Sequence, residues 1–390
     1  MRSLSLLGSA ALLLLALAAT GCSDKDNDNP GADCPHMAGR LCDGGREFID
    51  EDAGTIVRRD GGGELLWGEG ALLAISTSIP GQEKLVLYDI DADKRVTINY
   101  ADINLGMGLA GVTQGLTWNA ARTYLYIAQS GPNSVLFFSM GTKDIAWDYP
   151  FSDTTQLSRP ILSADNKSLY LASSTDKALY KIDVPGRLLA QKVKDTDVPA
   201  LSSPISVSYG AGSVLVGSAL GNRLLAFNDS TTLSYDTAKS VDLVDGANQG
   251  AGPTSCIATK DAAFYCAASG AGAGIWYVKP GSPAKLVIPG VTSVSAMALS
   301  SLNEKLWVGT GSSLNAYWIA RDPQAPLFLG SVAAGAPIFD IASSADGLWV
   351  FASVPTADAL LKVRSTDLKL VKTFTDLGRP RALAVGPFPN

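Results

Sequence analysis

Six stretches of the chain share one pattern of short strands and turns. Each reads as a short apolar strand, a polar turn, a strand with an aromatic residue near its start, a small-residue loop, and further alternating strands. The stretches are residues 115–140, 160–193, 204–229, 253–278, 294–319 and 337–374, and a shorter copy at 70–98 lacks the opening strand. Such a repeat constrains the fold strongly, because one copy buries its apolar face only by packing against the next.

The spacing of the repeats predicts the architecture. An apolar anchor begins the second strand of each copy, and the anchors span 276 residues in six steps, a mean period of 46. Four short strands per unit at this period are typical of β-propeller blades. The sequence therefore predicts an all-β fold, a seven-bladed β-propeller over residues 64–390. The anchors are Leu72, Leu125, Leu169, Val214, Phe264, Leu306 and Leu348.

The end of the chain predicts how the ring closes. "GRPRALAVGP", residues 378–387, matches the opening strand of a repeat with no further strand after it. Because the first copy lacks that strand, we expect the C-terminal strand to complete the first blade, which leaves no blade edge unpaired. No segment of ten residues after the N-terminal leader has the 3.6-residue period of a helix.

Aromatic residues recur directly after the anchors. Five of these seven positions are aromatic, namely Tyr126, Tyr170, Tyr265, Trp307 and Trp349. Large flat side chains cover much area in the wedge between blades, so we expect core packing here. A platform for carbohydrate is the alternative.

One turn resembles that of a known repeat family. "SADGLWV", residues 344–350, is similar to the repeats of the seven-bladed YVTN and quinoprotein-dehydrogenase-like propellers, which read roughly P-x-x-[IV]-A-x-S-x-D-G-x-x-L-Y-V-A. Other copies match more loosely: "ADNK", residues 164–167, lacks the glycine. The resemblance implies the propeller fold and says little about activity, because this scaffold hosts many unrelated functions.

Residues 1–21 have the features of an export signal that ends at a cysteine. Arg2 supplies a positive start, and residues 4–19 form an uncharged apolar stretch shorter than the about 20 residues of a membrane span. "ATGC", residues 19–22, resembles a bacterial lipobox, which implies cleavage before Cys22 and its acylation, including by palmitate. Ser23 follows instead of Asp, which in the enterobacterial sorting pattern implies the outer membrane. An ordinary signal peptide with an incidental cysteine is the alternative.

A polar tether and a small loop are expected over residues 22–63. Residues 23–33 carry almost no apolar side chain and cannot bury enough surface to fold alone. Asp24, Asp26 and Asp28 have the spacing of a calcium loop, but Asn29 and Pro35 replace its glycine and glutamate. Calcium is therefore a weak alternative, and no other cofactor is predicted.

The four remaining cysteines form two close pairs, as expected of an exported chain in an oxidising compartment. Cys256 and Cys266 lie equidistant from a predicted hairpin turn at Asp261, which places them opposite each other within disulfide range. Cys34 and Cys42 are expected to staple a small N-terminal loop. They bracket the only histidine of the chain, but a zinc site would need two further ligands that the neighbouring sequence lacks.

Charge and histidine content exclude several function classes. The chain has 31 Lys and Arg against 37 Asp and Glu, a net charge of −6, so nucleic-acid binding is not expected. The single histidine lies outside the repeats, which excludes a Ser-His-Asp triad in the propeller. "GMGLAG", residues 106–111, spells G-x-G-x-x-G but precedes a strand and not a helix, so it does not predict dinucleotide binding. Catalysis by carboxylates alone stays open, with Asp165, Asp340 and Asp346 as candidates, although repeat turns and inner strands need polar residues there anyway.

Loops that lead into the inner strands and loops that join the second and third strands form one face of a propeller. We expect a ligand site on this face, because a rigid scaffold positions its loops. The candidate ligand-binding residues are Gln114, Gln129, Arg159 and Arg379, with Asn133, Asp176 and Asn222 nearby. Two guanidinium groups, each before a proline, would hold an anion at the channel mouth. Two solvated surface arginines are the alternative.

These features favour one function class and leave two others open. The first is an envelope-anchored lipoprotein, a monomer, that binds or scaffolds a protein, peptide or glycan partner. The second is a periplasmic or surface hydrolase or lyase, lactonase-like, that uses carboxylates at the central channel. The third is a purely structural envelope component. No catalytic residue is assigned.

Overall fold

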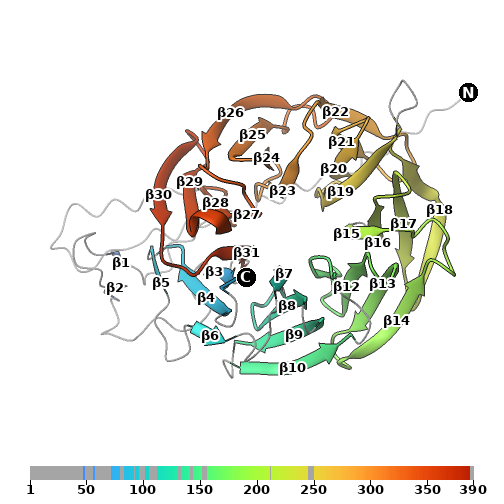
Figure 1. Cartoon of the computed structure of the whole chain (residues 1–390), viewed down its shortest axis with the longest axis horizontal. Coiled ribbons are helices and arrows are strands. Elements are labelled where there is room, and N and C mark those ends of the chain that lie inside the picture. Colours follow the sequence, from blue (N-terminus) through green and yellow to red (C-terminus); the bar gives the residue numbers. More distant parts are fainter. Residues whose placement is uncertain are drawn as a thin grey trace, which may run out of the picture.

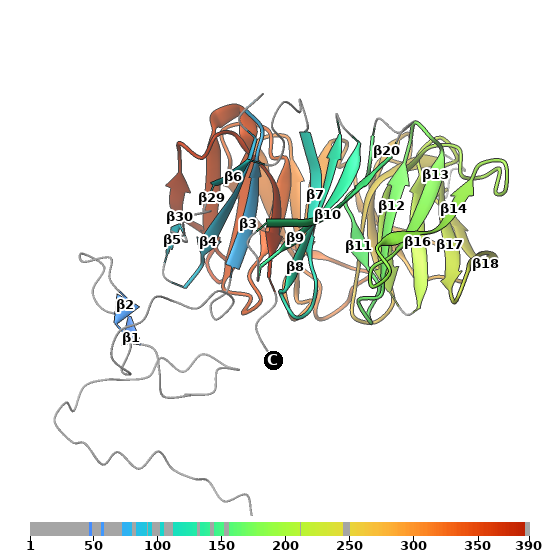
Figure 2. The same cartoon turned by 90° about the horizontal axis from the view of Figure 1, so that it is seen from below.

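Seven antiparallel sheets, six of four strands and one of five, stand around a central channel (Figure 1) and form a disc in the perpendicular view (Figure 2). The computed structural model describes residues 72–386 apart from gaps at 80–82, 92, 96–101, 105–111, 131–132, 141–143, 152–155, 211 and 245–249, together with residues 47–48 and 56–57. Within these ranges the only helix is the 3₁₀ turn η1 (Pro355–Ala357). The predicted all-β, seven-bladed propeller is confirmed.

Each blade is an antiparallel meander that runs from the channel to the rim, and the blades follow the chain in order. Blade 2 is β7 (Val112–Trp118), β8 (Tyr124–Ser130), β9 (Ser134–Ser139) and β10 (Asp144–Pro150); blade 3 is β11 (Ile161–Leu162), β12 (Ser168–Ser173), β13 (Ala178–Asp183) and β14 (Leu188–Lys194); blade 4 is β15 (Pro204–Gly210), β16 (Ser213–Ser218), β17 (Arg223–Asp229) and β18 (Leu233–Asp242). Blade 5 is β19 (Ala251–Ala258), β20 (Phe264–Gly270), β21 (Gly274–Val278) and β22 (Lys285–Pro289); blade 6 is β23 (Val294–Leu299), β24 (Lys305–Thr310), β25 (Ser313–Trp318) and β26 (Leu327–Ala333); blade 7 is β27 (Asp340–Ser343), β28 (Trp349–Val354), β29 (Ala359–Arg364) and β30 (Lys369–Phe374).

Blade 1 joins the two ends of the ring. Its strands are β3 (Leu72–Thr77), β4 (Lys84–Asp89), β5 (Lys94–Arg95) and β6 (Asp102–Asn104), and its innermost strand is β31 (Pro380–Val385). Leu73 pairs with Val385 and Ile75 with Leu383, so the C-terminal strand completes the first blade as predicted. A further strand pair, β1 (Glu47–Phe48) with β2 (Ile56–Val57), belongs to none of the blades.

The aromatic residues after the anchors pack between blades. Tyr126, Tyr170, Tyr265 and Trp307 are at most 1% exposed, and Trp349 is partly buried. Each belongs to an apolar cluster that it shares with the following blade; Tyr126, for example, packs with residues of β12 and β13. Core packing is therefore confirmed for this position of the repeat.

Two buried lysines also join neighbouring blades. Lys181 on β13 donates to Asp229 Oδ1 at 2.9 Å and to the Ser230 carbonyl at 2.7 Å. Lys362 holds the same place on β29 and donates to Asp93 Oδ1 of blade 1 at 2.6 Å. Both lysines are buried, so each needs its acidic partner to offset the loss of water around the charge.

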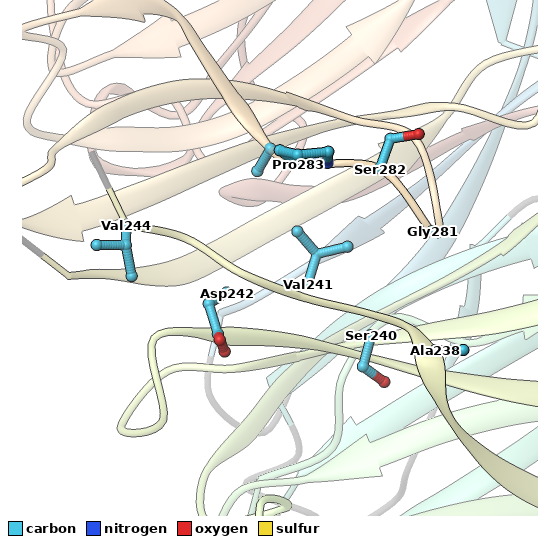
Figure 3. Close-up of a pocket in the computed structure, with 9 residues that line it drawn as sticks. Ala238, Ser240, Val241, Asp242, Val244, Gly281, Ser282 and Pro283 are labelled. Atoms are coloured by element: carbon cyan, nitrogen blue, oxygen red, sulfur yellow. The ribbon is translucent and has the colours of Figure 1, made fainter. Parts of the chain in front are cut away.

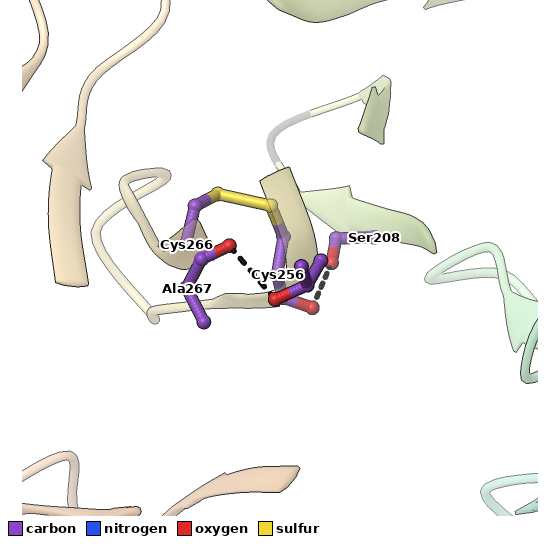
Figure 4. The surroundings of a disulfide bond; sticks show 5 residues. Ser208, Cys256, Cys266 and Ala267 are labelled. Atoms are coloured by element: carbon purple, nitrogen blue, oxygen red, sulfur yellow. Dashed lines mark hydrogen bonds between the residues drawn. A yellow bond between two sulfur atoms is a disulfide. The ribbon is translucent and has the colours of Figure 1, made fainter. Parts of the chain in front are cut away.

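The predicted disulfide between Cys256 and Cys266 is present, and it crosses β19 and β20 (Figure 4). The two Cα atoms are 4.1 Å apart. Ser208 of blade 4 donates to the Cys256 carbonyl at 2.6 Å, so the bridged hairpin is also tied to the preceding blade.

The Lys181–Asp229 pair generates the first prediction. Lys181→Met removes the positive charge and leaves a buried carboxylate unpaired, which we expect to lower the free energy of unfolding by about 3–5 kcal/mol. Lys177→Met is the matched control, because its pair with Asp195 is solvent-exposed and contributes at most about 1 kcal/mol. Urea denaturation of both variants measures the difference, and equal losses would contradict the assignment.

Candidate functional site

The inner strands line the channel, and several of them carry a β-bulge near the face where they begin. Register shifts lie between Thr113 and Gly115 on β7, and at comparable places on β15, β19 and β23. On β31 the irregular segment contains Arg381. Since a bulge redirects one side chain relative to its neighbours, these positions determine which groups are presented at the channel.

Arg159 spans the channel from the segment before β11. Its guanidinium pairs with Asp340 of blade 7, with Nη1 3.3 Å from Oδ1 and Nη2 3.3 Å from Oδ2. Its Nε donates to the Leu116 carbonyl of blade 2 at 3.2 Å, and Nη2 also donates to the Leu383 carbonyl of blade 1. A Cβ at Gly115 would lie 2.6 Å from the Arg159 Cα, so only glycine allows this close approach. One side chain therefore joins four blades.

Asp340 is satisfied on both oxygens. Besides the guanidinium, it accepts from the backbone N–H of Leu383 and of Ile341, each at 2.8 Å. Burial raises the pKa of this carboxyl, while the Arg159 charge and the two amides act in the opposite direction. Because these contacts use the carboxylate, Asp340 serves as the centre of a structural network.

A hollow of about 300 Å³ lies beside this network. Arg159 is the charged residue of its wall, and the Ser343 hydroxyl on the same wall has no hydrogen-bond partner in the described part of the chain. Trp118 Nε1 donates a hydrogen bond to the Ala384 carbonyl at 3.0 Å. The lining residues are Leu116, Thr117, Trp118, Arg159, Ile341, Ala342, Ser343, Ala384 and Val385.

The other predicted ligand residues lie at separate places on the same face. Gln114 occupies the bulge of β7, and Gln129 is buried on β8 opposite Thr113. Arg379 is exposed, with its backbone N–H donating to Asp358 Oδ1 at 2.5 Å. Arg159 and Arg379 thus contact different partners, and a joint anion site remains a prediction.

Two of the carboxylates considered for catalysis form hydrogen bonds that stabilise the turns between the first and second strands of their blades. Asp165 accepts from the Ser163 hydroxyl at 2.6 Å, and Asp346 accepts from the Leu348 N–H at 2.9 Å. Among the described residues, no group of three or more His, Cys, Asp or Glu side chains has the arrangement of a metal site. The same residues contain no helix that is long and apolar enough to cross a membrane.

Several predictions lie outside the described residues. These are the lipidation of Cys22, the pairing of Cys34 with Cys42, the boundaries at residues 21 and 63, and the glycine-rich stretch 106–111.

Arg381 on β31 was not anticipated as a site residue. Its guanidinium carbon lies 3.9 Å from the centre of the Phe339 ring, and its Nε is buried without a hydrogen-bond partner within the described ranges. Burial lowers the pKa of this side chain, because the charged form has lost water. The sequence did contain a signal: Arg381 lies one residue beyond the Arg-Pro pair, in the bulge region where β7 carries Gln114.

A second hollow of about 300 Å³ lies at the outer rim (Figure 3). It is bounded by β18 and by the turn between β21 and β22. Asp242 on its wall pairs with Arg223 Nε at 2.6 Å. The rim hollow therefore offers a ligand no free charge that is comparable to Arg381.

Comparisons with known proteins show the fold. No protein-family model and no curated protein sequence matches the chain. Among solved structures, a "putative 6-phosphogluconolactonase" from Bacteroides fragilis superposes with a TM-score of 0.63 at 10% identity and covers 81% of this chain and 98% of its own. A protein described in the same words from Bacteroides uniformis gives 0.64 at 10% identity, with 81% and 99% covered. Apo AztD from Citrobacter koseri gives 0.57 at 10% identity, with 81% and 98% covered. At this identity the likeness is evidence for the propeller alone.

The Arg159–Asp340 pair generates the second prediction. Arg159→Met leaves the Asp340 carboxylate buried without its counter-charge and should cost about 3 kcal/mol at pH 7. Burial raises the folded-state pKa of Asp340 above its value in the unfolded chain. Above the folded-state pKa the buried carboxylate is ionised, and this destabilises the fold. The loss of stability should therefore shrink as the pH falls through the folded-state pKa. Denaturation of Arg159→Met from pH 7 to pH 5 measures this recovery. The double variant Arg159→Met/Asp340→Asn should lack the recovery, and a similar pH dependence in both would contradict the assignment.

Proposed function

We propose that this protein is an envelope-anchored lipoprotein whose propeller binds or scaffolds a protein, peptide or glycan partner. The observation that carries the proposal is that the candidate catalytic carboxylate on the channel is already occupied by protein groups. Asp340 pairs with Arg159 and accepts from two backbone amides. Loop residues on the face where the inner strands begin are exposed to solvent. A rigid ring that presents exposed loops suits recognition.

The binding face follows from the strand directions. Because strands alternate in direction, the loops between second and third strands lie on the face where the inner strands begin. Ser174 of one such loop donates to Gln156, which precedes the inner strand of blade 3, at 2.8 Å. Leu220, between β16 and β17, is 79% exposed on this face. Leu220 is therefore accessible to a partner that binds this face.

Attachment to the membrane rests on the lipobox-like sequence before Cys22. Acylation of the sulfur and of the new amino group would supply more than one chain, and two or more chains anchor a protein stably where one does not. The polar residues 23–33 would then separate the propeller from the lipid surface.

A lactonase-like hydrolase is the second candidate. The observation that favours it is the likeness to two structures described as putative 6-phosphogluconolactonases. At 10% identity this likeness concerns the fold, so the assignment to catalysis would need acidic groups other than the three carboxylates located above.

Replacing the anchor cysteine tests the location. Cys22→Ser in the full chain should move the protein from the membrane fraction to the soluble fraction and abolish labelling by palmitate, because no sulfur remains for acylation. Cys34→Ser, a change at a nearby cysteine, should leave both unchanged. Membrane retention and labelling of Cys22→Ser would overturn the lipoprotein assignment.

Site-specific photo-cross-linking in intact cells tests the binding face. A photo-reactive residue at Leu220 should give discrete cross-linked products on gels, because the proposed partner contacts this face. The same residue at Leu302, which is 66% exposed on a first-to-second-strand loop of the opposite face, is the matched control and should give few or none. Equal cross-linking at both positions, or at neither, would contradict the proposal.

A further inference from the structure

Arg381 lies at the beginning of the innermost strand of blade 1, on the proposed binding face. Strand β31 stands between β7 and β27, whose residues it contacts along the channel. Phe339, directly before β27, covers one face of the guanidinium at 3.9 Å. Stacking on an aromatic ring holds the planar guanidinium in one orientation. The stacking itself uses none of the N–H donors of the group.

No carboxylate in the described part of the chain compensates the charge of Arg381. Arg159, Arg223 and Arg364 each pair with an aspartate, whereas no described carboxylate forms an ion pair with Arg381. Its Nε is buried and donates to no described acceptor. Buried or half-buried charges in proteins are normally paired, since loss of water around an ion is unfavourable. A guanidinium that has lost part of its water and has no counter-ion among the described residues is a ready receptor for an anion.

We propose that Arg381 binds an oxyanion, a carboxylate or a phosphate group of the bound partner, at the mouth of the channel. The inference rests on the proposed binding function and specifies its chemistry. A guanidinium carries its N–H donors in a fixed planar fork, which matches two oxygens of a carboxylate or phosphate. Phe339 keeps the plane fixed, so less side-chain entropy is lost on binding. Asp340 does not compete for Arg381, because Arg159 and two amides already occupy its oxygens.

Titration of the purified protein with inorganic phosphate and, separately, with succinate tests the proposal, at pH 7 and constant ionic strength. Saturable binding of either probe is expected, with a rise in melting temperature that follows mass action. The probe that binds distinguishes a phosphate ligand from a carboxylate ligand. Arg381→Gln should weaken binding at least tenfold. Arg364→Gln, which changes an exposed, paired arginine of blade 7, should bind as the wild type does.

Two further readouts separate a binding role from a structural one. Without anion, Arg381→Gln should be at least as stable as the wild type, because an unpaired charge has been removed. In the wild type, the Nε–H resonance of Arg381, assigned by its absence in Arg381→Lys, should shift on addition of the probe. An unperturbed resonance, or equal weakening in Arg364→Gln, would overturn the proposal. If the anion test fails while cross-linking at Leu220 still occurs, only the anion site is wrong, and the proposed binding function is retained.

Discussion

The pairing of β31 with β3 is the contact on which the ring depends. It supplies the inner strand that the first repeat lacks, and it makes one closed body from segments about 300 residues apart, as the Ser76–Ala382 hydrogen bond shows. The same strand presents the Leu383 carbonyl to Arg159 and the Leu383 N–H to Asp340. Closure of the ring and the channel network therefore share one strand, so we expect their contributions to stability to be coupled.

The contribution of a charged side chain to the stability of this propeller depends on its partner. Arg159 and Lys181 are charges whose acidic partners lie on another blade, so their removal would leave a desolvated carboxylate behind. The aromatic residues between blades bury apolar area and leave no unpaired charge when they are replaced. Most blade interfaces contain one of them. Arg381 belongs to neither group. A charge that weakens the empty fold and gains a counter-ion on binding is a feature expected of a recognition site.

The proposed binding function and the anion site use different parts of one face. Exposed loop tips such as Leu220 offer area for a large partner, whereas Arg381 and Phe339 offer one directional contact at the centre. A ligand that combines an apolar surface with an acidic group would use both. The rigid ring keeps these contacts at fixed separation, so binding would require little ordering of the propeller.

The sequence by itself determined the blade number, the closing strand, the aromatic wedges and the Cys256–Cys266 bridge. These follow from a regular period and from local hairpin geometry, in which near neighbours fix each other's position. The tertiary structure alone decided that Arg159 meets Asp340, 181 residues away, and that Arg381 meets no carboxylate within the described ranges. The physical reason is that these contacts join side chains of different blades, and which side chains converge at the channel depends on how the blades pack around the closed ring.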